Sequence, residues 1–295
     1  ISSIPTVYGE KVVLRLLDKS AGRINRKTIG LEGADERAYD QLLQNSSGVI
    51  LIVGPTGSGK STTMCAMIQE LCREETNIMT LEDPVEYNIP GANQCQINEK
   101  TGMTFAVGLR SILRQDPDVI SVGEIRDGET ASIAVRAAIT GHLVLSTLHT
   151  NDAVSTISRL VDIGVEPYMI ASALRGVVSQ RLVRKICPHC RRAYTPTADE
   201  KIMLGIDEDA DVQFYKGTGC QECNHLGNRG RRAVFEILTV DRTLRRQITD
   251  DADTDKLKAV ALQQGLVTMK DNCRDLVLRG EISFPEAARA ISSMT

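Results

Sequence analysis

Short apolar runs alternate with longer segments of helical periodicity from residue 49 onward. Apolar runs at 49–53, 78–81, 119–123 and 143–147 predict strands. Apolar positions spaced three and four residues apart predict helices at 34–45, 61–74, 105–115, 130–140, 153–163 and 167–184. Strands that alternate with helices of about ten or more residues form a mostly parallel sheet with helices on its faces. The pattern therefore predicts an α/β fold.

The flanking regions show other patterns. Residues 1–20 alternate between apolar and polar positions around Tyr8, Gly9 and Glu10, which predicts two strands, and a polar linker follows. Residues 187–231 are irregular and rich in glycine, whereas the segment from Leu257 predicts short helices separated at Gly265 and Gly280. We therefore expect the end of an N-terminal domain plus a linker at 1–30, an α/β core at 31–185, a cysteine-bearing subdomain at 186–232 and a helical region at 233–295.

The composition argues against a nucleic-acid-binding protein and against a membrane-spanning one. The 295 residues have a net charge of −3 and contain 4 Phe, 6 Tyr and no Trp. Nucleic-acid binding depends mainly on basic charge and on stacking side chains, so this composition argues against a nucleic-acid partner. The longest apolar run is far shorter than the ~18 residues that span a bilayer, so we expect no transmembrane helix and a cytoplasmic location. Because the chain opens with Ile1 and has no basic and apolar leader, we expect a fragment of an unsecreted protein.

A glycine-rich loop follows the first strand of the predicted core. Residues 54–61 fit the pattern G-x-x-x-x-G-K-[ST] between an apolar run and a helical one. In such a loop, backbone N–H groups and the following helix terminus bind phosphate oxygens, the lysine reaches the β- and γ-phosphates, and the hydroxyl binds Mg²⁺. The predicted nucleotide-binding residues are Gly54, Pro55, Thr56, Gly57, Ser58, Gly59, Lys60, Ser61 and Thr62, with Ser61 as the Mg²⁺ ligand. We expect ATP and Mg²⁺ as ligands.

Two acidic segments supply candidate catalytic groups. Hydrolysis of a bound nucleoside triphosphate requires a carboxylate that orients the attacking water and another near the metal ion. Glu82, Asp83 and Glu86 follow one predicted strand, and Glu124 follows another. A solvated acidic loop is the alternative explanation for each segment, but a phosphate loop in the same sheet favours a function for Glu82, Glu86 and Glu124.

Four of the eight cysteines form two C-x-x-C pairs. Cys187 and Cys190 are separated from Cys220 and Cys223 by 29 residues. This spacing is typical of a structural Zn²⁺ site with four thiolates, and the surrounding arginines, Arg231 among them, offset its charge. The other cysteines are scattered in apolar segments, which favours a reducing cytosol over disulfides.

Four segments together resemble the signature boxes of the secretion ATPases, the hexameric motors of type II secretion and type IV pilus assembly. They are the phosphate loop at 54–62, the acidic segment at 82–87, the pair 109–118 and 123–127, and the segment 141–151. The resemblance extends to residues 4–17 and so covers nearly the whole chain. It implies a RecA-like P-loop ATPase core, a homo-hexamer, and indirect membrane association through inner-membrane platform proteins.

The same resemblance implies roles for individual residues. Glu86 or Glu82 would orient the water, and Glu124 would act from the metal-side strand, with the choice between the roles left open. His149 would sense the γ-phosphate, and Arg15 would stabilise charge from the N-terminal domain. Arg110, Arg114 and Arg126 are further candidates for charge stabilisation.

Several functions are compatible with this resemblance. Type II protein secretion is the main hypothesis, type IV pilus assembly is its nearest alternative, and the spacing of the cysteine pairs favours secretion. The retraction members of the family lack the four-cysteine insertion, so retraction is excluded. A nucleic-acid translocase and a scaffold that binds ATP without turning it over are the remaining alternatives.

Overall fold

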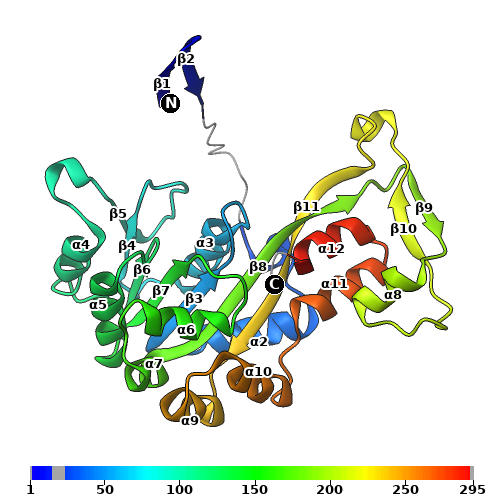
Figure 1. Cartoon of the computed structure of the whole chain (residues 1–295). Helices are drawn as coiled ribbons and strands as arrows, with labels where there is room; N and C mark the ends of the chain where they lie inside the picture. Colours follow the sequence, from blue (N-terminus) through cyan, green and yellow to red (C-terminus); the bar gives the residue numbers. More distant parts are fainter. Residues whose placement is uncertain (1, 15–23, 293–295) are drawn as a thin grey trace.

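A seven-stranded sheet forms the centre of the molecule (Figure 1). The structure is a computed structural model that describes residues 2–14 and 24–292. The strand order is β11 (Asn228–Thr239), β8 (Leu174–Ile186), β3 (Gly48–Val53), β7 (Leu143–Leu148), β6 (Val119–Val122), β4 (Ile78–Glu82) and β5 (Ala92–Gln96). All neighbours pair in parallel except β11, which runs antiparallel to β8. This confirms the predicted α/β class with a mostly parallel sheet.

Helices cover both faces of this sheet. The helices are α1 (Arg26–Ile29), α2 (Gly33–Leu43), α3 (Lys60–Leu71), α4 (Phe105–Ile112), α5 (Gly128–Ile139), α6 (Ser155–Asp162), α7 (Pro167–Ala173), α8 (Ala198–Leu204), α9 (Arg242–Asp250), α10 (Thr254–Gln263), α11 (Met269–Leu278) and α12 (Phe284–Ser292). Successive side chains of a strand point to opposite faces of the sheet. Every residue of β3 is buried because both of these faces are covered. Ile50 and Ile52 pack with α2 and α3, whereas Val49, Leu51 and Val53 pack with α4 to α7, α9 and α10.

Two long strands carry the chain beyond the sheet. β8 and β11 continue as an antiparallel ribbon toward the small hairpin of β9 (Arg191–Tyr194) and β10 (Phe214–Gly217), as Figure 1 shows. A separate small core lies beside this ribbon, where Val183 and Val234 pack with α8, α11 and α12. The same two strands therefore belong both to the central sheet and to the cysteine-bearing segment.

The helix predicted at 167–184 is wrong beyond Ala173. The chain continues from there as β8, although its apolar positions also fit a helical period. β8 pairs with β3 on one side and with β11 on the other, and these distant strands override the local pattern. The segment is rich in β-branched residues, with Val177 and Val178 buried in the sheet.

Most other predicted elements are present within a few residues of their expected ends. A hairpin of β1 (Ser2–Thr6) and β2 (Gly9–Val13) occupies the N-terminal segment. The short C-terminal helices are separated at Gly265 and Gly280, as expected. The irregular segment at 187–231 contains β9, α8, β10 and the beginning of β11, and β11 crosses the boundary expected at residue 232. The division into four parts remains a proposal. In the described part of the chain, no helix has the length and apolar character needed to cross a membrane.

Candidate functional site

The phosphate loop connects β3 to α3 at the carboxyl edge of the sheet. Gly54, Gly57 and Gly59 have φ angles of 144°, 79° and 92°, which favour glycine. A Cβ atom at Gly54 would lie 2.5 Å from the carbonyl oxygen of Gln180 and 2.7 Å from Oγ of Ser58. The loop therefore needs glycine both for its conformation and for its close approach to β8.

The helix that follows the loop brings Lys60 and Ser61 to its first turn. Lys60 Nζ donates hydrogen bonds to the carbonyl oxygens of Gly54 at 2.7 Å and Pro55 at 3.1 Å. Burial lowers the pKa of Lys60, while the charge of Glu124 opposes this shift. The N-terminus of α3 has no side-chain cap, so its first N–H groups remain available for an anion.

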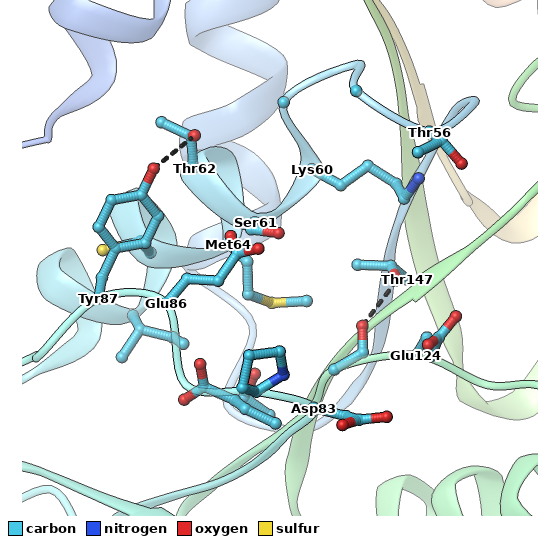
Figure 2. Close-up of a pocket in the computed structure, with 18 of the residues that line it drawn as sticks. Thr56, Lys60, Ser61, Thr62, Met64, Asp83, Glu86, Tyr87, Glu124 and Thr147 are labelled. Atoms are coloured by element: carbon cyan, nitrogen blue, oxygen red, sulfur yellow. Dashed lines mark hydrogen bonds between the residues drawn. The ribbon is translucent and has the colours of Figure 1, made fainter. Parts of the chain in front are cut away.

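A cavity of about 490 Å³ lies over the loop and collects most of the predicted site residues. Figure 2 shows Lys60 and Ser61 on one side of this cavity and Glu86 and Glu124 on other sides. The predicted residues that line it are Thr56, Gly57, Gly59, Lys60, Ser61, Thr62, Glu82, Glu86, Glu124 and His149. The remaining loop residues Gly54, Pro55 and Ser58 belong to the same turn but do not line the cavity. Residues from four distant segments therefore meet at one place.

The carboxylates of Glu82 and Glu86 have different surroundings. Oε1 of Glu82 accepts hydrogen bonds from Thr80 Oγ1 at 2.7 Å and from Gln94 Nε2 at 2.8 Å. Among the described residues, none forms a hydrogen bond or an ion pair with the carboxylate of Glu86. Glu86 is therefore the freer of the two to bind a water molecule in the cavity.

Glu124 forms the centre of a charged group on the opposite side. Arg126 pairs with Glu124, and Nε2 of His149 lies 3.4 Å from its other oxygen. Burial raises the pKa of Glu124, but Arg126 and then His149 outweigh this effect, so its pKa lies below the usual value. Glu124 is thus held as a carboxylate at neutral pH, and His149 is held beside it.

The other predicted arginines have different positions. Arg15 falls outside the described residues. Arg110, on α4, pairs with Glu129 at 2.6 Å, and Arg114, just beyond the end of α4, donates to the carbonyl oxygen of Arg110. Both arginines are exposed. Among these candidates within the described part of the chain, Arg126 alone contacts a residue of the cavity.

Sequence reasoning missed several residues of the cavity. Tyr87 lines it and its hydroxyl lies 3.3 Å from Oγ1 of Thr62, as Figure 2 shows. Leu182 on β8 and Arg231 on β11 also line it. Arg231 was expected only to offset the charge of the cysteine site. No local pattern marks these two residues, because the pairing of β8 with β11 brings them to the loop.

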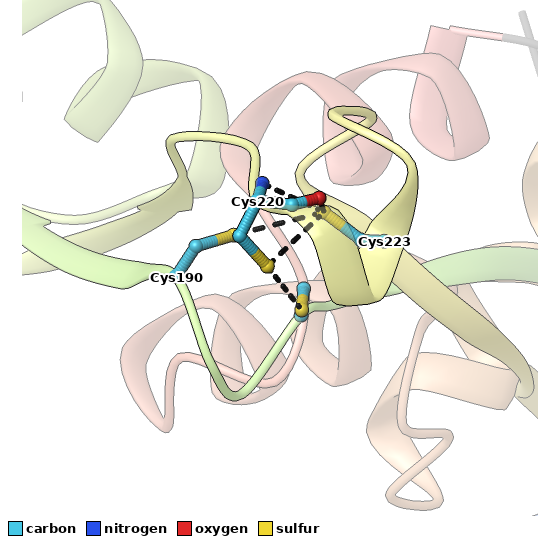
Figure 3. A group of neighbouring side chains, drawn as sticks. Cys190, Cys220 and Cys223 are labelled. Atoms are coloured by element: carbon cyan, nitrogen blue, oxygen red, sulfur yellow. Dashed lines mark hydrogen bonds between the residues drawn. The ribbon is translucent and has the colours of Figure 1, made fainter.

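The four paired cysteines converge at the far end of the ribbon (Figure 3). Their sulfur atoms all lie within 4.8 Å of one another, with Sγ–Sγ distances of 3.8 Å for Cys187 and Cys220, 3.9 Å for Cys190 and Cys223, and 3.7 Å for Cys220 and Cys223. A tetrahedral Zn²⁺ ion with Zn–S bonds of about 2.3 Å requires sulfur atoms about 3.8 Å apart. The donor set therefore fits Zn²⁺.

Backbone groups support negative charge on this cluster. Sγ of Cys223 accepts from the N–H groups of Cys220 at 3.3 Å and Gly227 at 3.2 Å. Burial disfavours the thiolate of Cys223, yet these backbone hydrogen bonds lower its pKa overall. Such N–H donors are the outer contacts expected around bound thiolates.

Comparisons with known proteins show the family of the chain. A family model described as "Type II/IV secretion system protein" matches residues 1–289. Type II secretion system protein E of Pseudomonas aeruginosa is 46% identical over 98% of this chain and 57% of its own length. Type IV pilus assembly ATPase PilB of Thermus thermophilus is 45% identical over 99% of this chain and 33% of its own length. The chain thus spans little more than half the length of the type II relatives.

A solved structure shows the same architecture. The crystal structure of the pilus retraction motor PilT with bound ADP superposes with a TM-score of 0.68. Its sequence is 34% identical, over 90% of this chain and 66% of that chain. The family match over nearly all residues, the shared fold and the phosphate-loop cavity lead to one conclusion. The chain belongs to the type II/IV secretion system protein family.

Proposed function

We propose that the chain binds ATP with Mg²⁺ in the cavity over the phosphate loop and hydrolyses it. The observation that carries this proposal is that residues of the phosphate loop, Ser61 among them, and four carboxylates line a single cavity of about 490 Å³. This volume lies within the range of about 300–1,000 Å³ that is usual for small-molecule sites. The ADP in the similar PilT structure supports a nucleotide as the ligand.

Each side chain has a role that its position supports. The N–H groups of the loop and of the first turn of α3 would bind the phosphates, and Lys60 would exchange its carbonyl contacts for phosphate oxygens. Ser61 would hold Mg²⁺, which neutralises phosphate charge when bound. Glu86 would orient the attacking water because its carboxylate has no partner among the described residues, and Glu82 is the alternative. Glu124 and His149 would face the γ-phosphate side.

Two further parts of the proposal concern groups outside the cavity. Arg15 would stabilise phosphate charge from the N-terminal domain. Cys187, Cys190, Cys220 and Cys223 would bind a structural Zn²⁺, because four thiolates leave no open coordination position for catalysis.

We further propose that the whole protein is a cytoplasmic hexameric motor for type II protein secretion, attached to the inner membrane through platform proteins. The 46% identity to a type II secretion system protein E supports this function. Type IV pilus assembly is the alternative, supported by 45% identity to a pilus assembly ATPase. A nucleic-acid translocase is disfavoured by the net charge of −3.

Calorimetry and turnover with Mg²⁺ and ATP test the proposal on the full chain. We expect wild-type protein to bind and hydrolyse ATP, and Lys60→Ala to lose both. Lys256→Ala is a matched control, because Lys256 is exposed on α10, does not line the cavity, and pairs with Asp251 in the turn before this helix. A wild-type protein that takes up no adenine nucleotide would contradict the proposal, and salt-sensitive binding to DNA would favour the translocase.

A further inference from the structure

Two buried side chains of opposite charge are neighbours on the paired strands β8 and β11. Arg181 on β8 and Glu236 on β11 are each only 5% exposed. Arg181 is opposite Val234 and Glu236 is opposite Ser179 in the antiparallel register. The two charges therefore lie on the same face of the sheet as diagonal neighbours. Buried charges are costly unless they are paired and hydrogen-bonded, so their partners indicate what they do.

Both side chains hold the loop between β7 and α6. Nη2 of Arg181 donates to the carbonyl oxygen of Asn151 at 2.7 Å. Oε1 of Glu236 accepts from the N–H group of Ala153 at 3.1 Å. A cation thus fixes one carbonyl of this loop, and an anion fixes an N–H group two residues later. His149, which lies beside Glu124, is at the start of the same loop.

The other contacts of this pair extend in two directions. Oε2 of Glu236 accepts a hydrogen bond at 3.1 Å from the N–H group of Met269. Met269 is the first residue of α11. A carboxylate is favoured at this end of a helix. On β8, the neighbouring Gln180 donates through Nε2 to the carbonyl oxygen of Ser58 in the phosphate loop at 2.7 Å. Two adjacent residues of β8 therefore contact the phosphate loop and the loop that carries His149.

Three other charged groups act on this pair. Asp152, in the held loop, attracts Arg181 and repels Glu236, and Lys258 of α10 attracts Glu236. Lys60 is repelled by Arg181. Arg181 thus lies close enough to Lys60 to act on its charge. Glu236 lies against the loop between β7 and α6.

We propose that Arg181 and Glu236 are positioning residues for ATP hydrolysis, which hold the backbone of residues 151–153 so that His149 stays beside Glu124. This inference rests on the proposed function. Neither residue lines the cavity. Their effect therefore falls on turnover rather than on binding of ATP, and Glu236 makes the geometry of the His149 loop depend on the docking of α11.

Glu236→Gln tests the role of the carboxylate in the full chain. The amide keeps the shape of the side chain but turns an N–H donor toward one of the two backbone N–H groups. We expect kcat to fall about tenfold or more while KM for ATP changes less than about threefold. Ile237→Val is the matched control, because Ile237 is the next buried residue of β11 and belongs to the core on the other face. It should change kcat less than about twofold.

A double-mutant cycle with His149→Ala separates positioning from general destabilisation. If Glu236 acts through the His149 loop, adding Glu236→Gln to His149→Ala should lower kcat less than about twofold further. Arg181→Lys keeps the charge but not the reach to Asn151, and the same cycle should give the same non-additivity. It serves as the second variant if Glu236→Gln does not fold.

Each outcome decides the inference. Additive losses of kcat in both cycles would overturn it, and so would a rise in KM with unchanged kcat. Wild-type protein without ATP turnover in the same assay would instead overturn the proposed function, and the positioning role would be rejected with it. Turnover by the wild type together with additive losses would reject the positioning role alone.

Discussion

Glu86 and Glu82 differ in whether their carboxylates already accept hydrogen bonds, and this difference separates their candidate roles. Within the described part of the chain, Glu86 is the one carboxylate of the acidic segment that lines the cavity and has no partner. We therefore expect Glu86→Gln to lower kcat about 100-fold or more with ATP affinity retained. Glu82→Gln keeps an oxygen acceptor for Thr80 and Gln94 and should lower kcat less than about tenfold. Turnover and calorimetry on both variants check this order. The reverse order would assign the water to Glu82.

A second prediction at the residue scale concerns Asp35, at the beginning of α2. Burial raises the pKa of Asp35 to about 6, against the hydrogen bonds from Asn272 and the charge of Arg232, and Glu32 adds to the rise. The folded protein thus binds this proton more tightly than the unfolded chain, whose Asp pKa is about 3.9. The free energy of unfolding should therefore decrease as pH rises from about 4 to about 6.

Asp35→Asn should remove this pH-dependent component. The amide still offers an oxygen acceptor to Asn272 but cannot ionise. The free energy of unfolding of the variant, compared with that of the wild type, should therefore increase as pH rises from about 4 to about 6. The increase should reach at most about 3 kcal/mol, because one pKa unit corresponds to about 1.36 kcal/mol. Urea denaturation at several pH values measures the difference. A difference that stays constant between pH 4 and pH 7 would contradict the prediction.

At the scale of elements, Gly176 sets how closely β8 approaches its neighbours. A Cβ atom there would collide with the backbone carbonyl of Leu238 on β11 and with the side chain of Leu42. We expect Gly176→Ala to lower the free energy of unfolding by about 1–3 kcal/mol, because a paired strand cannot move aside. Chemical denaturation of the variant measures this loss.

Gly108→Ala provides the matched control on α4. The added Cβ would lie 2.6 Å from Cδ2 of Leu81, a buried side chain rather than backbone, and alanine gains about 1 kcal/mol of helix propensity over glycine. The loss of stability should therefore be smaller than that of Gly176→Ala. Equal losses for both variants would show that the backbone contact at Gly176 is not the cause.

The difference between β8 and the phosphate loop shows what sequence patterns can predict. The position of the glycine-rich loop between β3 and α3 was predicted correctly, because its residues are contiguous and its conformation depends on its own glycines. β8 was mistaken for a helix because its strand pairs are β3 and β11, which are distant in sequence. Arg231 was assigned to the cysteine site for the same reason, since only the pairing of β8 with β11 brings it to the cavity.

At the scale of the whole molecule, the cysteine cluster and the cavity over the phosphate loop lie at different points along one ribbon. β8 passes the phosphate loop at Gln180 and ends just before Cys187, and β11 returns from the cluster to the cavity. The small core of α8, α11 and α12 packs against this ribbon at Val183 and Val234. Near the phosphate loop, β8 is held by its pairing with β3, which does not depend on the cysteines.

Removal of the metal should therefore affect stability more than nucleotide binding. We expect a strong chelator, or Cys223→Ser, to lower the melting temperature by several degrees, because a bound metal stabilises the folded state that holds its ligands. ATP affinity should change less than about threefold, since Val53 of β3 still pairs with Ser179 of β8 next to Gln180. Cys72→Ser is a control for thiol loss alone, because this partly exposed cysteine is outside the cluster. Parallel loss of melting temperature and ATP affinity on metal removal would place the metal in the nucleotide site.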